Sequence, residues 1–132
     1  MSASLFERAG GTDGLRRLFT DFYERVFDDA MIGFFFKGKD RARLIEKETE
    51  LASKLLGADV AYTGRSLPEA HAAHTIFGGQ FLRRLQILKD AMEAQGIDPA
   101  VRESLVEHTL ALRPQITGQL PGECRMPTDP VD

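Results

Sequence analysis

The sequence predicts an all-α protein, and two observations carry this prediction. Apolar residues recur at helical spacing in four segments, whereas no segment shows the strict alternation of a half-buried strand. Glycine and proline stand near the ends of these segments, where helices begin and stop. The 132 residues, 42% apolar and 28% charged, suffice for one globular domain. We expect a helical domain over residues 1–117 and a flexible, proline-rich tail over 118–132.

The four predicted helices have recognisable boundaries. They span approximately residues 12–28, 40–56, 77–95 and 98–114. Thr12 or Asp13 can cap the first helix, Gly57 ends the second, Gly96 ends the third, and Asp98 followed by Pro99 begins the fourth. The residues expected to face inward are Leu15, Leu18, Phe19, Phe22, Tyr23, Val26, Leu44, Leu51, Ala52, Leu55, Phe77, Phe81, Leu85, Leu88, Met92, Val101, Leu105, Thr109 and Leu112.

A long segment between the second and third helices, residues 57–76, has no clean period. Loops of that length inside a compact domain usually serve a function. Residues 66–74 could form one or two helical turns, capped by Ser66.

Charge and composition exclude several classes of protein. With 17 basic and 20 acidic residues, the net charge of −3 argues against a nucleic-acid-binding protein that works through bulk electrostatics. The longest apolar stretch, residues 30–36, is far shorter than the roughly 20 residues that cross a bilayer. No secretory signal is visible, and Cys124 is the single cysteine. These features exclude an intramolecular disulfide and make the reducing cytoplasm the expected compartment.

The histidines are the first candidates for chemistry. His71 and His74 lie three residues apart, so on a helix both would share one face. A zinc site is disfavoured because neither cysteines nor an HExxH pattern accompany them, and two loop histidines without a ligand are the plain alternative. A single imidazole opposite an aromatic-rich helix can instead hold haem iron. The nine phenylalanines would suit such an apolar cleft, although they could equally form an ordinary core.

Several short segments, in order along the chain, resemble the truncated haemoglobins. They are residues 5–11, 14–15, 21–26, 34–38, 62–65, 70–71 and 75–76, followed by Phe81. The resemblance runs in register from about residue 4 to 117. The chain has no tryptophan, whereas two of the three main groups of this family carry one facing the ligand pocket. The chain is therefore similar to the remaining group, group one.

The resemblance implies a globin-like, two-over-two helical sandwich around haem b. His71 corresponds to the proximal ligand of the iron. Tyr23 corresponds to the distal tyrosine, whose hydroxyl can donate a hydrogen bond to the bound gas, and Phe36 to the phenylalanine that stacks on the porphyrin. Leu44 and Glu48 correspond to the two distal residues of the second helix.

Further residues are expected around the haem. Leu67, Ile76 and Phe81 should line it. Lys47 and His74 could each reach a propionate, and His74 could equally be solvated. Some group-one members attach haem through a histidine late in the last helix. The matching position here is about Thr117, so we expect non-covalent haem.

Two residues depart from the family pattern. Glu48 stands where a neutral residue such as glutamine is common, and an ionised glutamate can only accept hydrogen bonds. Arg84 stands on the apolar face of its helix, where the family usually has an apolar residue. We hypothesise that Glu48 and Arg84 pair across the distal side, because a buried charge requires a partner. The alternative is that helix rotation carries both to the surface.

The resemblance implies reversible binding of dioxygen, and of carbon monoxide or nitric oxide, as in oxygen transport, storage or sensing. An enzyme is the second hypothesis: a nitric oxide dioxygenase, served by a reductase, or a peroxidase-like protein using Glu48 and Arg84. A haem-free binding module is disfavoured because His71, Tyr23 and Phe36 are all retained. Monomer and weak homodimer both stay open.

Overall fold

Residues 4–59 and 78–117 are described by the computed structural model, and every regular element in these ranges is helical. The elements are α1 (Leu5–Arg8), α2 (Gly11–Phe27), η1 (Gly33–Phe36), α3 (Arg41–Leu55), α5 (Gly78–Ala94) and α6 (Pro99–Thr117). The all-α prediction is confirmed. Among these helices, none combines the length and apolar character that crossing a membrane requires.

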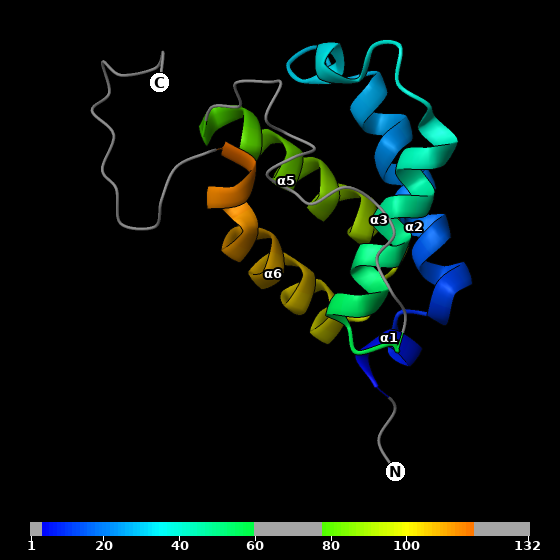
Figure 1. Cartoon of the computed structure of the whole chain (residues 1–132). Helices are drawn as coiled ribbons and strands as arrows, with labels where there is room; N and C mark the ends of the chain where they lie inside the picture. The colour runs from blue at the N-terminus through cyan, green and yellow to red at the C-terminus, as the bar shows by residue number, and fades with distance from the viewer. Residues whose placement is uncertain (1–3, 60–77, 118–132) are drawn as a thin grey trace.

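The long helices form two antiparallel pairs. In Figure 1, α2 and α3 lie side by side and run in opposite directions, as do α5 and α6. Helix α2 also packs against α5 and so joins the two pairs, while the short α1 contacts α2 and α6. The predicted two-over-two arrangement of helices is therefore present.

Helix α2 supplies much of the core. All of its predicted inward residues, from Leu15 to Val26, are buried. They contact α3 on one side and α5 on the other, which requires the broad apolar face that the sequence shows. On α5 and α6, the predicted core residues Phe81, Leu85, Leu88, Met92, Val101 and Leu105 are buried as well.

The buried face of α3 differs from the prediction. Of its predicted stripe only Ala52 is buried, while the three leucines are half-buried, and Thr49 and Ser53 take the interior positions instead. The Thr49 hydroxyl donates to the carbonyl of Ile45 at 2.8 Å, and the Ser53 hydroxyl to that of Thr49 at 2.7 Å. These small side chains satisfy their own polar groups within the helix, so they can be buried without another partner.

The start of α2 also differs from the prediction. Neither Thr12 nor Asp13 caps the helix; its N-cap is Gly10, in the left-handed conformation with φ of 92°. Before it lies α1, which was not predicted from the sequence. Ser4 and Glu7 begin this helix with reciprocal capping hydrogen bonds. A four-residue helix is too short to show a period. The tight junction between α1 and α2 uses the freedom of glycine at positive φ.

Asp29 ties the turn after α2 to α5. Its Oδ2 accepts the backbone N–H groups of Met31 and Ile32, and its Oδ1 accepts the Arg83 guanidinium at 2.7 Å. The Arg83 hydrogen bond lowers the pKa of Asp29 below its ordinary value, aided by the two backbone donors, while burial opposes this shift. The folded state therefore holds the Asp29 carboxylate in its charged form.

Asp29→Asn is expected to lower the free energy of unfolding by about 1–2 kcal/mol at pH 7, because the Asp29 side chain, 8% exposed, loses a charge-assisted hydrogen bond from a guanidinium that is itself 41% exposed. Because the pKa of Asp29 is lower in the folded state, its ionised form stabilises the fold at pH values above the unfolded-state pKa of about 3.9. This stabilisation is lost as the pH falls through the pKa of the folded state. Urea unfolding of both proteins from pH 7 to pH 3 should therefore show the difference shrinking with acid. The exposed neighbour Asp28, changed to asparagine, is the control; an equal loss there would contradict the assignment.

Candidate functional site

Three helices bring one polar side chain each to the same point in the interior. Tyr23 comes from α2, Glu48 from α3 and Arg84 from α5; we call these three residues the polar trio. The Tyr23 hydroxyl donates to Glu48 Oε1 at 2.9 Å, and Arg84 Nη2 donates to the same oxygen at 3.1 Å. The hypothesised pair between Glu48 and Arg84 is present, and the alternative, that helix rotation carries both residues to the surface, is wrong.

The trio is largely withdrawn from water. Tyr23 is 4% exposed, and the side chains of Glu48 and Arg84 are 21% and 20% exposed. The Arg84 guanidinium also lies over the Phe22 ring, 4.9 Å from its centroid. This cation–π contact fixes the guanidinium from the side of α2 and helps a charged group to stay inside the fold.

The surroundings fix the charge states of Tyr23 and Arg84. Burial raises the pKa of the Tyr23 hydroxyl well above its ordinary value, and the negative charge of Glu48 raises it further, while Arg84 opposes this in part. For Arg84, burial alone would lower the pKa, but Glu48 and Tyr23 raise it above its ordinary value. At neutral pH the tyrosine therefore keeps its proton and the arginine its charge.

Aromatic rings surround Tyr23. Its ring makes edge contacts with Phe22 at 4.9 Å between centroids, with Phe36 at 6.0 Å and with Phe27 at 6.4 Å. Phe36, at the end of η1, is half-buried and also contacts Phe27. The structure thus brings together Tyr23 and Phe36, two predicted site residues that lie on the successive elements α2 and η1.

The other predicted site residues fall into two sets. Leu44 is half-buried and packs against the core, Phe81 is buried, and Lys47 is half-buried with its Nζ 3.6 Å from Glu50 Oε2. The remaining four lie outside the described residues: Leu67, His71, His74 and Ile76. Within residues 4–59 and 78–117, no cluster of three or more histidine, cysteine or acidic side chains could hold a metal ion.

The support around Arg84 was not predicted from the sequence. Phe22 was assigned to the core, and its ring under the guanidinium was not foreseen. Neither was the ion pair of the adjacent Arg83 with Asp29, which fixes α5 against the turn after α2. The available signal was the pair of consecutive arginines on α5, each of which meets an acidic side chain from another element.

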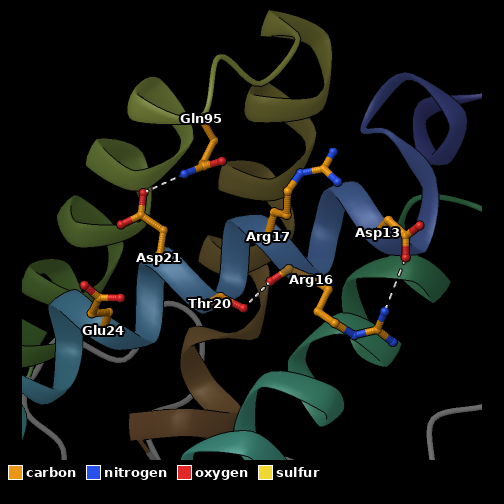
Figure 2. A pocket seen from close by; sticks show the side chains of 7 residues that line it. All are labelled: Asp13, Arg16, Arg17, Thr20, Asp21, Glu24 and Gln95. Atoms are coloured by element: carbon orange, nitrogen blue, oxygen red, sulfur yellow. Dashed lines mark hydrogen bonds and ion pairs between the residues drawn. The ribbon is translucent and has the colours of Figure 1, made fainter.

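A surface hollow along α2 is not part of this site. Figure 2 shows it, lined by Asp13, Arg16, Arg17, Thr20, Asp21, Glu24 and Gln95. Much of its charge is paired locally: Arg16 binds Glu46 and Asp13, and Asp21 binds Arg25 and the Gln95 amide. None of the predicted site residues lines it.

The polar trio, in contrast, combines groups that can act on a small ligand. It offers a hydroxyl, a carboxylate and a guanidinium in a mostly apolar setting, where hydrogen bonds are stronger than in water. These groups can orient a small polar molecule and could transfer a proton to or from it.

Comparisons with known proteins agree on one family. The sequence model of the bacterial-like globins matches residues 4–117. The chain is 30% identical over 118 residues to the group 1 truncated hemoglobin GlbN of Mycolicibacterium paratuberculosis, covering 89% of this chain and 87% of that protein. It is 26% identical over 109 residues to the group 1 truncated hemoglobin of Tetrahymena pyriformis, covering 80% and 90%. The crystal structure of truncated hemoglobin from Tetrahymena pyriformis in its Fe(III) form superimposes with a TM-score of 0.80 at 23% identity, covering 86% and 97%.

Proposed function

The chain belongs to the bacterial-like globin family, among the group 1 truncated haemoglobins, and from this premise we propose that it binds haem b and, at a histidine-ligated iron, dioxygen and other diatomic gases. Haem is the cofactor of this family. When bound, it supplies a ferrous iron that takes up such gases reversibly. The observation that carries the proposal is the convergence of the polar trio, beside Phe36, in an otherwise apolar interior.

The described residues fit a haem. Several apolar side chains pack one side against the core and leave the other partly uncovered: Phe27, Phe35, Phe36, Leu44 and Ile45. A flat apolar porphyrin would cover surface of this kind and exclude water from the trio. Phe36 would stack on it, and Tyr23, Leu44, Glu48 and Arg84 would face the gas.

The remaining assignments complete the proposed site. His71 is the iron ligand, Lys47 and His74 contact the propionates, and Leu67, Ile76 and Phe81 line the haem. Because residue 117 is threonine, haem is held without a covalent bond to that position. Dioxygen carriage, rather than catalysis, is the leading function.

A peroxidase-like activity is the second candidate, and the Glu48–Arg84 pair is the observation that favours it. The carboxylate and guanidinium, 3.1 Å apart, could serve as acid–base group and charge stabiliser for a bound peroxide. Turnover of a peroxidase dye that falls strongly in both Glu48→Gln and Arg84→Leu would favour this function over gas carriage. Nitric oxide dioxygenation, with a reductase, would be tested by nitric oxide consumption.

The experiment that tests the proposed function is hemin titration, with His71→Ala as the decisive variant. The wild-type protein is expected to take up one hemin per chain and, once reduced, to shift its absorption maximum when carbon monoxide is added. His71→Ala should weaken hemin binding by roughly 100-fold or more, since removing partners of a metal ligand alone costs 10–100-fold. His108→Ala, on α6, is the matched control and should bind as the wild type does. A colourless protein that refuses hemin would overturn the proposal.

A further inference from the structure

The hydrogen-bond direction at Tyr23 limits what this residue can offer a ligand. A tyrosine hydroxyl has a single hydrogen but also lone pairs that accept. An ionised carboxylate only accepts, so in the bond between Tyr23 and Glu48 Oε1 the hydroxyl must be the donor. Its one hydrogen is therefore directed at Glu48, and its oxygen can only accept, from the neighbouring Arg84 guanidinium or from a ligand.

The surroundings of Glu48 make this arrangement difficult to reverse. Its Oε1 also accepts a hydrogen bond from Arg84 Nη2, and the Arg84 guanidinium is held over the Phe22 ring. Hydrogen bonds to a charged group are roughly twice as strong as neutral ones, and the low exposure of Tyr23 strengthens this one further. Turning the hydroxyl toward a ligand would remove a donor from a carboxylate that is only about one-fifth exposed.

We propose that Glu48, held by Arg84, makes Tyr23 a hydrogen-bond acceptor at the gas site, so that the site favours ligands with a hydrogen on the bound atom, such as hydrosulfide, over ligands that only accept. Dioxygen belongs to the second class, as does fluoride, so dioxygen would be carried at this site without a hydrogen bond from Tyr23. Tyr23 contacts the ligand, while Glu48 and Arg84 are positioning residues. The inference rests on the proposed function, because it takes the haem to lie against the polar trio.

Replacing the Glu48 carboxylate by an amide reverses the direction of the hydrogen bond with Tyr23 while changing the shape of the side chain little. In Glu48→Gln, the amide oxygen can accept from Arg84 and the amide N–H₂ can donate to the Tyr23 oxygen. The Tyr23 hydrogen is then released for a ligand. The same residue that accepts in the wild type would donate in the variant.

The test measures two dissociation constants on the ferric, haem-loaded protein under anaerobic conditions, one for fluoride and one for hydrosulfide. Glu48→Gln should bind fluoride several-fold more tightly and hydrosulfide more weakly, changing the ratio by about tenfold, as expected from one hydrogen bond gained and one lost. Both ligands bind as anions, so the removed charge affects them alike and cancels in the ratio. Hydrogen bonds from the Arg84 N–H groups to the ligand would be present in both the wild type and Glu48→Gln, so they do not account for a difference between the two proteins.

Two further variants connect the effect to Tyr23. Glu46→Gln removes the same charge from α3, at an exposed residue that pairs with Arg16, and should leave the ratio unchanged. In a Tyr23→Phe background, adding Glu48→Gln should no longer change the ratio, because the effect passes through the hydroxyl.

A second readout does not depend on any ligand of haem. The chain has two tyrosines, so in a Tyr62→Phe background the ultraviolet Raman doublet of tyrosine reports on Tyr23 alone. Its intensity ratio distinguishes a donating from an accepting hydroxyl. The expected result is a strong donor in the otherwise wild-type protein and a weakened donor in Glu48→Gln.

The outcomes separate the two proposals. Hemin uptake with an unchanged fluoride-to-hydrosulfide ratio in Glu48→Gln would overturn this inference and leave the proposed function standing. This inference would also be overturned if Glu46→Gln changed the ratio as much as Glu48→Gln does, or if the Raman doublet of Tyr23 showed no donated hydrogen bond. Failure to take up hemin would overturn the proposed function and the inference together.

Discussion

Replacing Gly14 by alanine is expected to lower the free energy of unfolding by about 3 kcal/mol or more. Gly14 is buried on α2, where α1 turns back against it. A Cβ added there would overlap the carbonyl oxygen of Ala9 and lie 3.0 Å from its carbonyl carbon. These are backbone atoms, which a rotamer change cannot move, so the junction between α1 and α2 must open; overpacking typically costs 1–3 kcal/mol and occasionally more.

Gly79→Ala, in α5, is the matched control for this substitution. A Cβ at Gly79 would meet only the Met31 Cε, at 4.0 Å, which is an ordinary contact. Because alanine favours helices over glycine by up to about 1 kcal/mol, stability should stay equal or rise slightly. Urea unfolding of both variants, in the same state of haem loading, checks the prediction. Similar midpoints for the two would mean that α1 does not pack closely on α2.

The long helices were predictable from the sequence because their apolar period agrees with their burial. Helix α2 shows this best, because it packs against both α3 and α5 and most of its broad apolar face is buried. A small error in the predicted rotation of the helix about its axis therefore does not change which residues are expected to be buried. Helix α3 shows the limit. It packs on α2 through Thr49, Ala52 and Ser53, and hydrophobicity alone does not predict the burial of two hydroxyl residues that bond within their own helix.

The short elements were not predictable by period. Helix α1 and η1 are four residues each, about one turn, so they depend on capping, glycine conformation and tertiary contact. The capping pair of Ser4 and Glu7 was a usable signal that periodicity ignores. At Gly10, two successive glycines favoured a left-handed turn over a side-chain cap.

The residues of the polar trio and the contact between Glu48 and Arg84 were predicted from the sequence, with two exposed charges as the alternative, but the detailed geometry of the trio was not. Glu48 and Arg84 each interrupt an apolar stripe, which indicates either a buried pair or two exposed charges. The choice depends on how two helices far apart in the chain are rotated, and packing on Phe22 and Tyr23 decides it. Only the structure shows that Tyr23 and Arg84 donate to the same carboxylate oxygen of Glu48, the observation on which the inference about Tyr23 rests.

Arg84→Leu is expected to lower the free energy of unfolding by about 2–3 kcal/mol, because it leaves the Glu48 carboxylate without its counter-charge. Breaking a fully buried pair typically costs 3–5 kcal/mol, and the one-fifth exposure of both side chains reduces this. Tyr23 would still donate to Glu48, which moderates the loss further. Urea unfolding at pH 7, with haem loading matched because a bound cofactor stabilises the folded state by mass action, measures the effect.

The double variant Glu48→Gln with Arg84→Leu should recover most of that loss, to within about 1 kcal/mol of the wild type. It contains no buried charge, and the glutamine oxygen can still accept the Tyr23 hydroxyl. Apolar replacement of a buried ion pair is often neutral for stability. With both single variants it completes a double-mutant cycle, and additive losses would show that the two side chains do not interact energetically in the folded protein. Recovery to wild-type stability would mean that the fold does not need the pair, which agrees with the proposal that Glu48 and Arg84 serve to direct the hydrogen of Tyr23.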